Sequence, residues 1–219
     1  MKRITLLLLL TICFSSCFEI REEVNMKADG SGEVQFVLNL SQSKDKVRTY
    51  LTMETVEGYK VPKKETVEAF MQHVKVTLGN VRGISEVFTK SDWSNYIFTV
   101  TCRFAHVDAL NEAIKTLSEQ ADYFPVDPVT SKNFSYNNSQ FQRIFDYPAK
   151  PKEFRELSSM QRYMLETAKM ISIYRFERSI RQFSNKKAQL SPSGKAIMLQ
   201  TSIADLTKGT ATLANSIGF

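Results

Sequence analysis

Apolar and polar residues alternate in two early segments of the chain, which is the pattern of β-strands with one buried face. The first segment, residues 18–27, has a row of alternate positions occupied by Phe18, Ile20, Glu22, Val24 and Met26, so that only Glu22 interrupts it. The second segment, residues 33–40, repeats the alternation. The turn sequence Asp29-Gly-Ser-Gly32 lies between them, and glycine readily adopts the positive φ angles of tight turns. The pattern predicts a β-hairpin.

Later segments show either helical spacing or further alternation. Helical spacing predicts helices over residues 41–57, over a stripe from Val67 to Leu78 that ends at Gly79, over residues 106–121, and over a stripe from Phe154 to Ile171. Alternation predicts strands over residues 81–89, 96–104, 173–180 and 195–201, and favours long strands with one wet face over the aromatic and amide-rich residues 134–147. Residues 203–219 are weakly amphipathic, which predicts a short helix with a loose tail.

This order of elements predicts the fold class. Hairpins that alternate with helices indicate an α+β fold, an antiparallel β-sheet built from hairpins with helices packed on one face. We expect residues 17–219 to form a single domain, and a division into two subunits, 17–121 and 122–219, stays open.

The N-terminus carries the pattern of an export signal. Two basic residues precede a leucine-rich run over residues 4–12, and two serines then lead to Cys17. The segment resembles the signal of bacterial lipoproteins, although Phe14 stands where Leu, Val or Ile is usual. The resemblance implies a signal peptide over residues 1–16, a lipid on Cys17 as the membrane anchor, and a place in the cell envelope. Phe18, rather than Asp, after the cysteine favours the outer membrane.

Positive charge is concentrated late in the chain. The net charge is +6, but residues 18–149 hold fifteen basic and eighteen acidic residues, whereas residues 150–195 hold eleven basic and four acidic ones. Such a segment suits anionic lipid or an acidic envelope protein, while export of the chain disfavours nucleic acid. A solvated, Lys- and Arg-rich face explains the charges equally well. The candidate contact residues are Arg155, Arg162, Lys169, Arg175, Arg178 and Arg181.

The sequence has no recognisable catalytic or metal-binding motif. His73 and His106 have neither the spacing of metal ligands nor a matching nucleophile. Cys102 is the one cysteine left after Cys13 and Cys17, and its apolar surroundings indicate a small buried residue rather than a nucleophile. We therefore expect a protein that is not an enzyme and that has no metal or cofactor.

Several loose strand and turn patterns are similar to the LppM-type lipoprotein domain. They are the hairpin after Cys17, the unit from Gly83 to Phe104 with the helix that follows it, and the late segments Arg175-Phe176, Ser184-Asn185 and 191–195. The resemblance implies a lipid-anchored α+β domain of the envelope without active-site residues to transfer. Proteins of this type often end in a membrane helix, and the sequence shows no such run.

Two functions follow as hypotheses. The first is an interaction or scaffold module at the membrane surface, held by Cys17 and in contact with anionic lipid or an acidic protein. The alternative is a binding protein for an apolar or carbohydrate ligand held between sheet and helices. Five methionines offer an adaptable lining for an apolar ligand, although at helical spacing they are typical of a core: Met53, Met71, Met160, Met164 and Met170.

The Cys17→Ala substitution tests the lipid anchor. In a bacterium with a lipoprotein pathway, the wild type should gain acyl mass and sediment with membranes, because buried acyl chains hold it there. The variant should stay soluble or uncleaved. Intact mass and membrane partition measure both, and identical behaviour of the two proteins would contradict the anchor.

Overall fold

A computed structural model describes residues 18–119, 132–146 and 148–219. The signal peptide expected over residues 1–16 and the lipidation expected at Cys17 lie outside the described residues, and neither is tested by the structure.

The predicted N-terminal hairpin forms the centre of the main sheet. It consists of β1 (Glu19–Met26) and β2 (Gly32–Asn39), paired antiparallel. Gly30 has φ +87° in the turn, and a Cβ atom on Gly32 would lie 2.2 Å from the backbone oxygen of Asn25. The hairpin was therefore correctly predicted. Gly30 supplies the positive φ angle expected of both turn glycines, whereas Gly32 does not and is required instead by the close approach of the Asn25 backbone.

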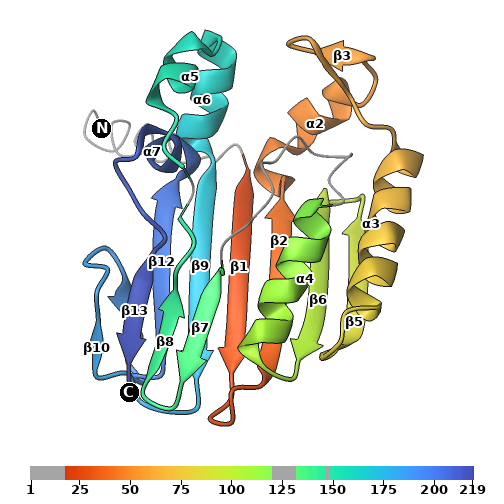
Figure 1. Cartoon of the computed structure of the whole chain (residues 1–219). Coiled ribbons are helices and arrows are strands. Elements are labelled where there is room, and N and C mark those ends of the chain that lie inside the picture. The colour runs from red at the N-terminus through yellow and green to blue at the C-terminus, as the bar shows by residue number, and fades with distance from the viewer. Residues whose placement is uncertain (1–17, 120–131, 147) are drawn as a thin grey trace, which may run out of the picture.

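The main sheet has seven strands in the order β11-β12-β9-β1-β2-β6-β5 (Figure 1). Its other members are β5 (Ile84–Asp92), β6 (Ile97–Phe104), β9 (Lys169–Phe176), β11 (Gln189–Leu190) and β12 (Ala196–Ser202). All neighbours pair antiparallel except β1 and β9, which run parallel with Glu19 opposite Lys169. The predicted α+β class is confirmed.

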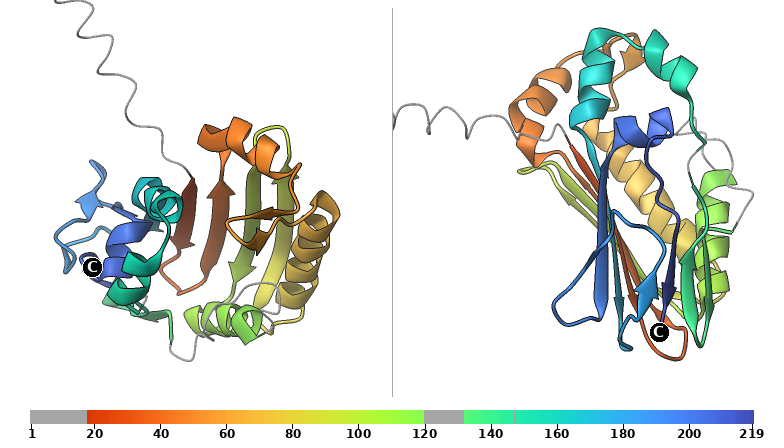
Figure 2. Two further views of the ribbon diagram at one scale, coloured as in Figure 1. Left: turned by 90° about the horizontal axis from the view of Figure 1, so that it is seen from above. Right: turned by 90° about the vertical axis from the view of Figure 1, so that its left-hand side faces the viewer.

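A second sheet packs on the same face as the helices (Figure 2). Its order is β10-β13-β8-β7, and its members are β7 (Phe134–Asn137), β8 (Gln140–Arg143), β10 (Gln182–Phe183) and β13 (Asn215–Gly218). The ring of Phe141 lies 5.2 Å from the ring of Tyr174 on the main sheet. The loose C-terminal tail was a wrong prediction: after the short helix α7 (Ile203–Lys208), the chain ends in β13 with Ile217 fully buried.

Two of the predicted helices match the structure closely. They are α3 (Lys64–Gly79) and α4 (Val107–Glu119), which lie side by side over β5 and β6 (Figure 1). The helix predicted over residues 41–57 is too long. The structure has a 3-10 turn η1 (Ser41–Ser43), α2 (Lys44–Tyr50), and a small hairpin of β3 (Thr55–Val56) and β4 (Tyr59–Lys60). Glu57 and Gly58 take positive φ angles in the hairpin turn, which ends any helix.

The helix predicted from Phe154 to Ile171 is also wrong. It is two short helices, α5 (Pro151–Glu156) and α6 (Ser159–Thr167), separated where Ser158 forms a capping box with Gln161. The next strand begins at Lys169 rather than at 173, and its alternate residues are buried. Apolar residues three or four positions apart are typical of a helix. Here the end of α6 and the start of β9 together produce the same spacing, so the pattern continued to Ile171 although the helix did not.

A buried ion pair links the two sheets. Glu22 and Arg143 are both almost fully buried, with Arg143 Nε 3.5 Å from Glu22 Oε1. The hydroxyl of Tyr174 donates to the same carboxylate oxygen at 2.6 Å. Arg143 also donates to the Phe145 carbonyl at 2.6 Å and to the Asn133 side chain at 3.3 Å. Glu22, the residue that interrupts the apolar row, is therefore part of the core.

This environment also affects the ionisation of Tyr174. Burial, followed by the negative charge of Glu22, raises the pKa of Tyr174 well above its usual value. Tyr174 is therefore held protonated as a hydrogen-bond donor to the carboxylate.

The Arg143→Met substitution tests how much the fold depends on this pair. It should lower the free energy of unfolding by about 3–5 kcal/mol, because it leaves the Glu22 carboxylate buried without its cation. Urea denaturation measures the change. A matched control is Arg103→Met, since Arg103 pairs with Glu86 at 2.7 Å on the surface and its loss should cost about 1 kcal/mol or less. Equal losses in the two variants would contradict the prediction.

Candidate ligand-binding site

The inner face of the main sheet is mainly apolar, with Glu22 as the charged residue in the inward row of β1, and it is packed only at one end. Val24, Val34 and Phe104 are buried, with Val24 at 0% exposure. On the same face, near the start of β1 and the end of β2, Ile20 is half-buried and Leu38 is 38% exposed. The covering layer therefore does not reach this end of the sheet.

Helix α3 shows the same gradient. Its C-terminal half contributes Val74 and Leu78 to the core, whereas Val67 and Phe70 in its N-terminal half are only partly buried. The apolar stripe is continuous, so the difference lies in what the stripe faces. Toward Lys64, the helix faces a space that side chains do not fill.

This space is an apolar pocket of about 790 Å³. The sheet supplies one wall, and α3 supplies another. Ligand pockets for small molecules span roughly 300–1,000 Å³ and are lined mainly by apolar and aromatic side chains. Of the twenty described residues that line this pocket, Lys60 is the only charged one.

The segment between β2 and α3, residues 41–63, forms the outer wall. We refer to it as the strap. Val47 and Tyr50 of α2 line the pocket, as do Leu51, which follows α2, and Tyr59 of β4, which is 68% exposed. Seen from above, α2 lies at the end of β2, and the small hairpin lies between α2 and α3 (Figure 2, left). The pocket therefore opens at the end of the molecule where β1 begins.

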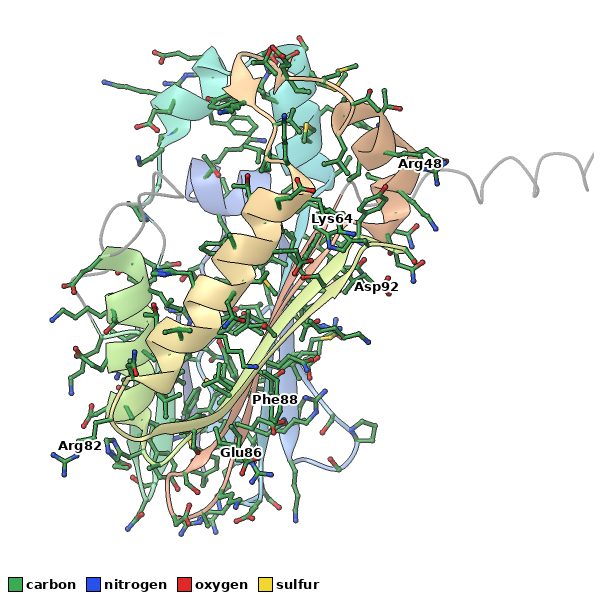
Figure 3. The ribbon with its side chains drawn as sticks, turned by 90° about the vertical axis from the view of Figure 1, so that its right-hand side faces the viewer. Arg48, Lys64, Arg82, Glu86, Phe88 and Asp92 are labelled. Atoms are coloured by element: carbon green, nitrogen blue, oxygen red, sulfur yellow. The ribbon has the colours of Figure 1, made fainter. Side chains whose placement is uncertain are left out.

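Aromatic residues of the β5–β6 turn complete the rim. Trp93, the single tryptophan of the chain, has edge contacts with Phe98 at 5.1 Å and with Tyr96 at 6.4 Å between ring centroids. Its indole N–H donates to the Glu68 carboxylate, and Lys64 Nζ lies 5.6 Å from its ring. Figure 3 shows Lys64 at the start of α3 near Asp92, the residue that precedes Trp93. These contacts connect α3 to the strand turn beside the pocket.

The predicted basic residues lie at both ends of the molecule. Lys169 starts β9 at the pocket end, whereas Arg175 lies about 20 Å further along the same strand, given a rise of ~3.3 Å per residue. Arg155 and Arg162 lie on α5 and α6, at the pocket end. Arg178 and Arg181 follow the far end of β9, and Arg178 donates to the Asn138 carbonyl in the β7–β8 turn. The fold therefore separates these six residues.

Few of the predicted ligand contacts belong to the pocket. Among the five methionines only Met71 lines it, while Met170 is buried in the core and Met53 and Met160 are exposed. Within the aromatic segment, residues 134–143 form the short hairpin β7–β8 in place of the long strands that were predicted, with Phe134 and Phe141 in the core, so they supply no groove. Residue 147 lies outside the described residues. Val67 and Phe70 do line the pocket, and both belong to the apolar stripe predicted from the sequence, a pattern equally typical of a packed helix.

The histidines have structural contacts. The ring Nδ1 of His106 accepts the backbone N–H of Ala109 at 3.1 Å, as a cap at the start of α4. His73 on α3 lies 3.4 Å from the hydroxyl of Thr77. Within the described ranges, no group of three or more His, Cys, Asp or Glu side chains is arranged to hold a metal ion.

None of the described helices has both the length and the apolar character needed to cross a bilayer.

Comparison with known proteins gives one structural likeness. No family model matches the chain, and no curated protein is significantly similar to it. The folded domain of LppM from Mycobacterium tuberculosis, solved by NMR, is similar to it with a TM-score of 0.41 and 12% sequence identity. The likeness covers 93% of this chain and 90% of that domain.

Cys102 provides a test of the packed end of the inner face. Burial, with a further contribution from the charge of Glu33, raises the pKa of its thiol to about 11. At neutral pH, Cys102 should therefore stay protonated and react very slowly with a water-soluble thiol reagent in the folded protein. Residues 18–219 contain no other cysteine, so titration of the folded and urea-unfolded chain measures this directly. Rapid reaction of the folded chain would show that this end is open.

Proposed function

We propose that this protein binds an apolar ligand, a lipid or fatty acid with a long hydrocarbon chain, between its main sheet and α3. The observation that carries the proposal is the pocket of about 790 Å³, whose twenty lining residues include a single charged side chain. The alternative function raised by the sequence is thereby favoured in its apolar form.

The physical argument is the cost of exposed apolar surface. Each Å² of apolar area that leaves water contributes roughly 25 cal/mol, so a hydrocarbon chain along this wall would be stabilised by its whole buried length. Polar groups are few and lie at the rim. Lys60 and the exposed Tyr59 would therefore meet the polar part of the ligand, while Phe36 and Val100 on the sheet meet its chain.

Binding is favoured over catalysis by the composition of the lining. The described lining residues include no His, Cys, Asp, Glu or Ser, so a Ser–His or Cys–His pair is not supplied there. We accordingly propose a carrier or sensor of the ligand rather than an enzyme.

We also retain envelope localisation as a proposal. Cys17 precedes the first residue of β1 by two positions, and β1 begins at the end of the sheet where the pocket opens. A lipid on Cys17 would thus hold the pocket close to the membrane. An interaction or scaffold role, and a place at the outer membrane, stay predictions.

Trp93 offers a direct measurement of ligand binding. A bromine-labelled fatty acid, below its micelle concentration, should quench the fluorescence of this single tryptophan, because bromine quenches only at short range and Trp93 lines the pocket. Saturable quenching with residues 18–219 supports the proposal. That chain contains every described element and lacks the apolar N-terminal run.

Two substitutions on α3 distinguish an effect on the pocket from a general effect on the helix. Val67→Asp places a charge in the lining and should weaken binding at least tenfold, since an unpaired carboxylate there disfavours hydrocarbon. Val76→Asp makes the same change at a site that is 52% exposed and outside the pocket, and should leave binding unchanged. Equal effects of the two, or no saturable quenching by the wild type, would contradict the proposal.

A further inference from the structure

Exposed apolar side chains gather at the end of the molecule where the pocket opens. Nine large apolar residues are exposed in the described part of the chain. Four of them come from the strap and from α6, namely Met53, Tyr59, Met160 and Tyr163. Both segments lie at this end (Figure 1). Methionine and tyrosine side chains held in water at one end of a molecule are typical of a contact surface.

Cations accompany these apolar residues. Lys46 Nζ lies 5.5 Å from the ring of Tyr163, which brings α2 next to α6. Arg162 donates to the Arg155 carbonyl at 3.0 Å, and Lys60 lies beside Tyr59 at the rim. Among the described residues, none of these four cations forms an ion pair with a carboxylate, so their charge remains available to a partner.

The far end of the molecule differs. Arg175 is paired with Glu23, and residues 177–183 contribute no exposed large apolar side chain. One exposed apolar residue, Leu190 of β11, lies at this end of the sheet, opposite Ile197. Arg178 and Arg181 therefore lie at an end with fewer exposed large apolar side chains than the pocket end. Acidic residues are also present at the pocket end. Asp45, Glu54 and Glu57 lie on the strap, and α5 and α6 carry Glu153, Glu156 and Glu166.

We propose that the pocket end docks on the surface of an anionic lipid bilayer. The docking surface consists of Lys46, Tyr59, Lys60, Met160, Arg162 and Tyr163. Tyrosine and methionine would enter the headgroup region while Lys and Arg meet lipid phosphates, the combination that holds proteins at membrane interfaces. Docking in this orientation turns the mouth of the pocket toward the lipid, so that a hydrocarbon chain can pass between bilayer and pocket without crossing water.

The orientation follows from strand register as well as from the surface. Three of the lining residues lie one position from a strand end, in β1, β2 and β6 respectively: Ile20, Leu38 and Phe98. The other lining residues of β2 and β6 lie further along these strands, namely Phe36, Val37 and Val100. The pairings of β2 with β1 and β6 place Ile20, Leu38 and Phe98 at the same end of the sheet. That end also carries α2 and α6, so pocket and docking surface face the same way (Figure 1).

Vesicle flotation with residues 18–219 tests the docking. The chain should float with vesicles of phosphatidylcholine and phosphatidylglycerol and should not float with phosphatidylcholine alone. Lys46→Glu with Arg162→Glu should weaken partition into the anionic vesicles about tenfold or more, because each basic residue near such a surface contributes substantially to affinity. Arg178→Glu with Arg181→Glu makes the same change of charge at the far end and should alter partition less than about twofold.

A second pair of variants separates docking from simple charge attraction. Met160→Ser with Tyr163→Ser should also weaken flotation, whereas Phe88→Ser, at a site 61% exposed on β5, should not. Equal losses from charge reversal at either end would overturn the oriented contact. Absence of flotation by the wild type would overturn docking altogether. If residues 18–219 bound no vesicles but bound an acidic protein, the docking surface would be a protein contact instead.

The proposal builds on ligand binding by the pocket, yet the two can fail separately. Quenching of Trp93 by a monomeric fatty acid needs no vesicle, so the Lys46→Glu and Arg162→Glu variant should keep it. The Val67→Asp variant should lose quenching but keep flotation. Flotation without quenching would sustain docking and reject the pocket ligand, and quenching without flotation would do the reverse.

Discussion

The position of β1 between β2 and β9 is the constraint on which the molecule depends. Antiparallel bonds hold it to its hairpin partner, and parallel bonds hold it to a strand from late in the sequence. Glu22 of β1 then binds Arg143 of the second sheet and the hydroxyl of Tyr174 on β9. Charges removed from water in this way are tolerated only with well-placed partners. One strand therefore joins the hairpin, the late half of the sheet and the covering sheet.

The pocket follows from how that sheet is covered. The second sheet and α4 close the inner face over Val24, Val34 and Phe104, but α3 approaches closely only along its C-terminal half. The remaining apolar face is bordered by the strap, which has few buried residues of its own. The same strands thus provide core at one end and an open apolar wall at the other.

The hairpins and the long helices could be predicted from the sequence, because the spacing of their apolar residues repeats over many positions, as in Val67–Leu78. The sequence was insufficient where short elements meet. Ala168 and Ile171 fit a helical stripe, although α6 ends at Thr167 and β9 begins at Lys169. The pocket could not be predicted for a different reason: a Phe70 that lines a cavity and a Phe70 in a packed core have the same sequence signal. The distance between Arg155 and Arg175 likewise could not be predicted. It depends on the direction in which β9 runs away from α5 and α6, and amino-acid composition carries no information on that direction.

The parallel pairing also has a consequence for how the chain is made. Glu19 and Lys169 are neighbours in the sheet although they are 150 positions apart in the sequence. During synthesis from the N-terminus, the hairpin exists long before β9 can occupy the free edge of β1. An unpaired strand edge is a template for wrong association between chains. The edge of β1 should therefore need protection from neighbouring chains until β9, which ends at Phe176, has emerged.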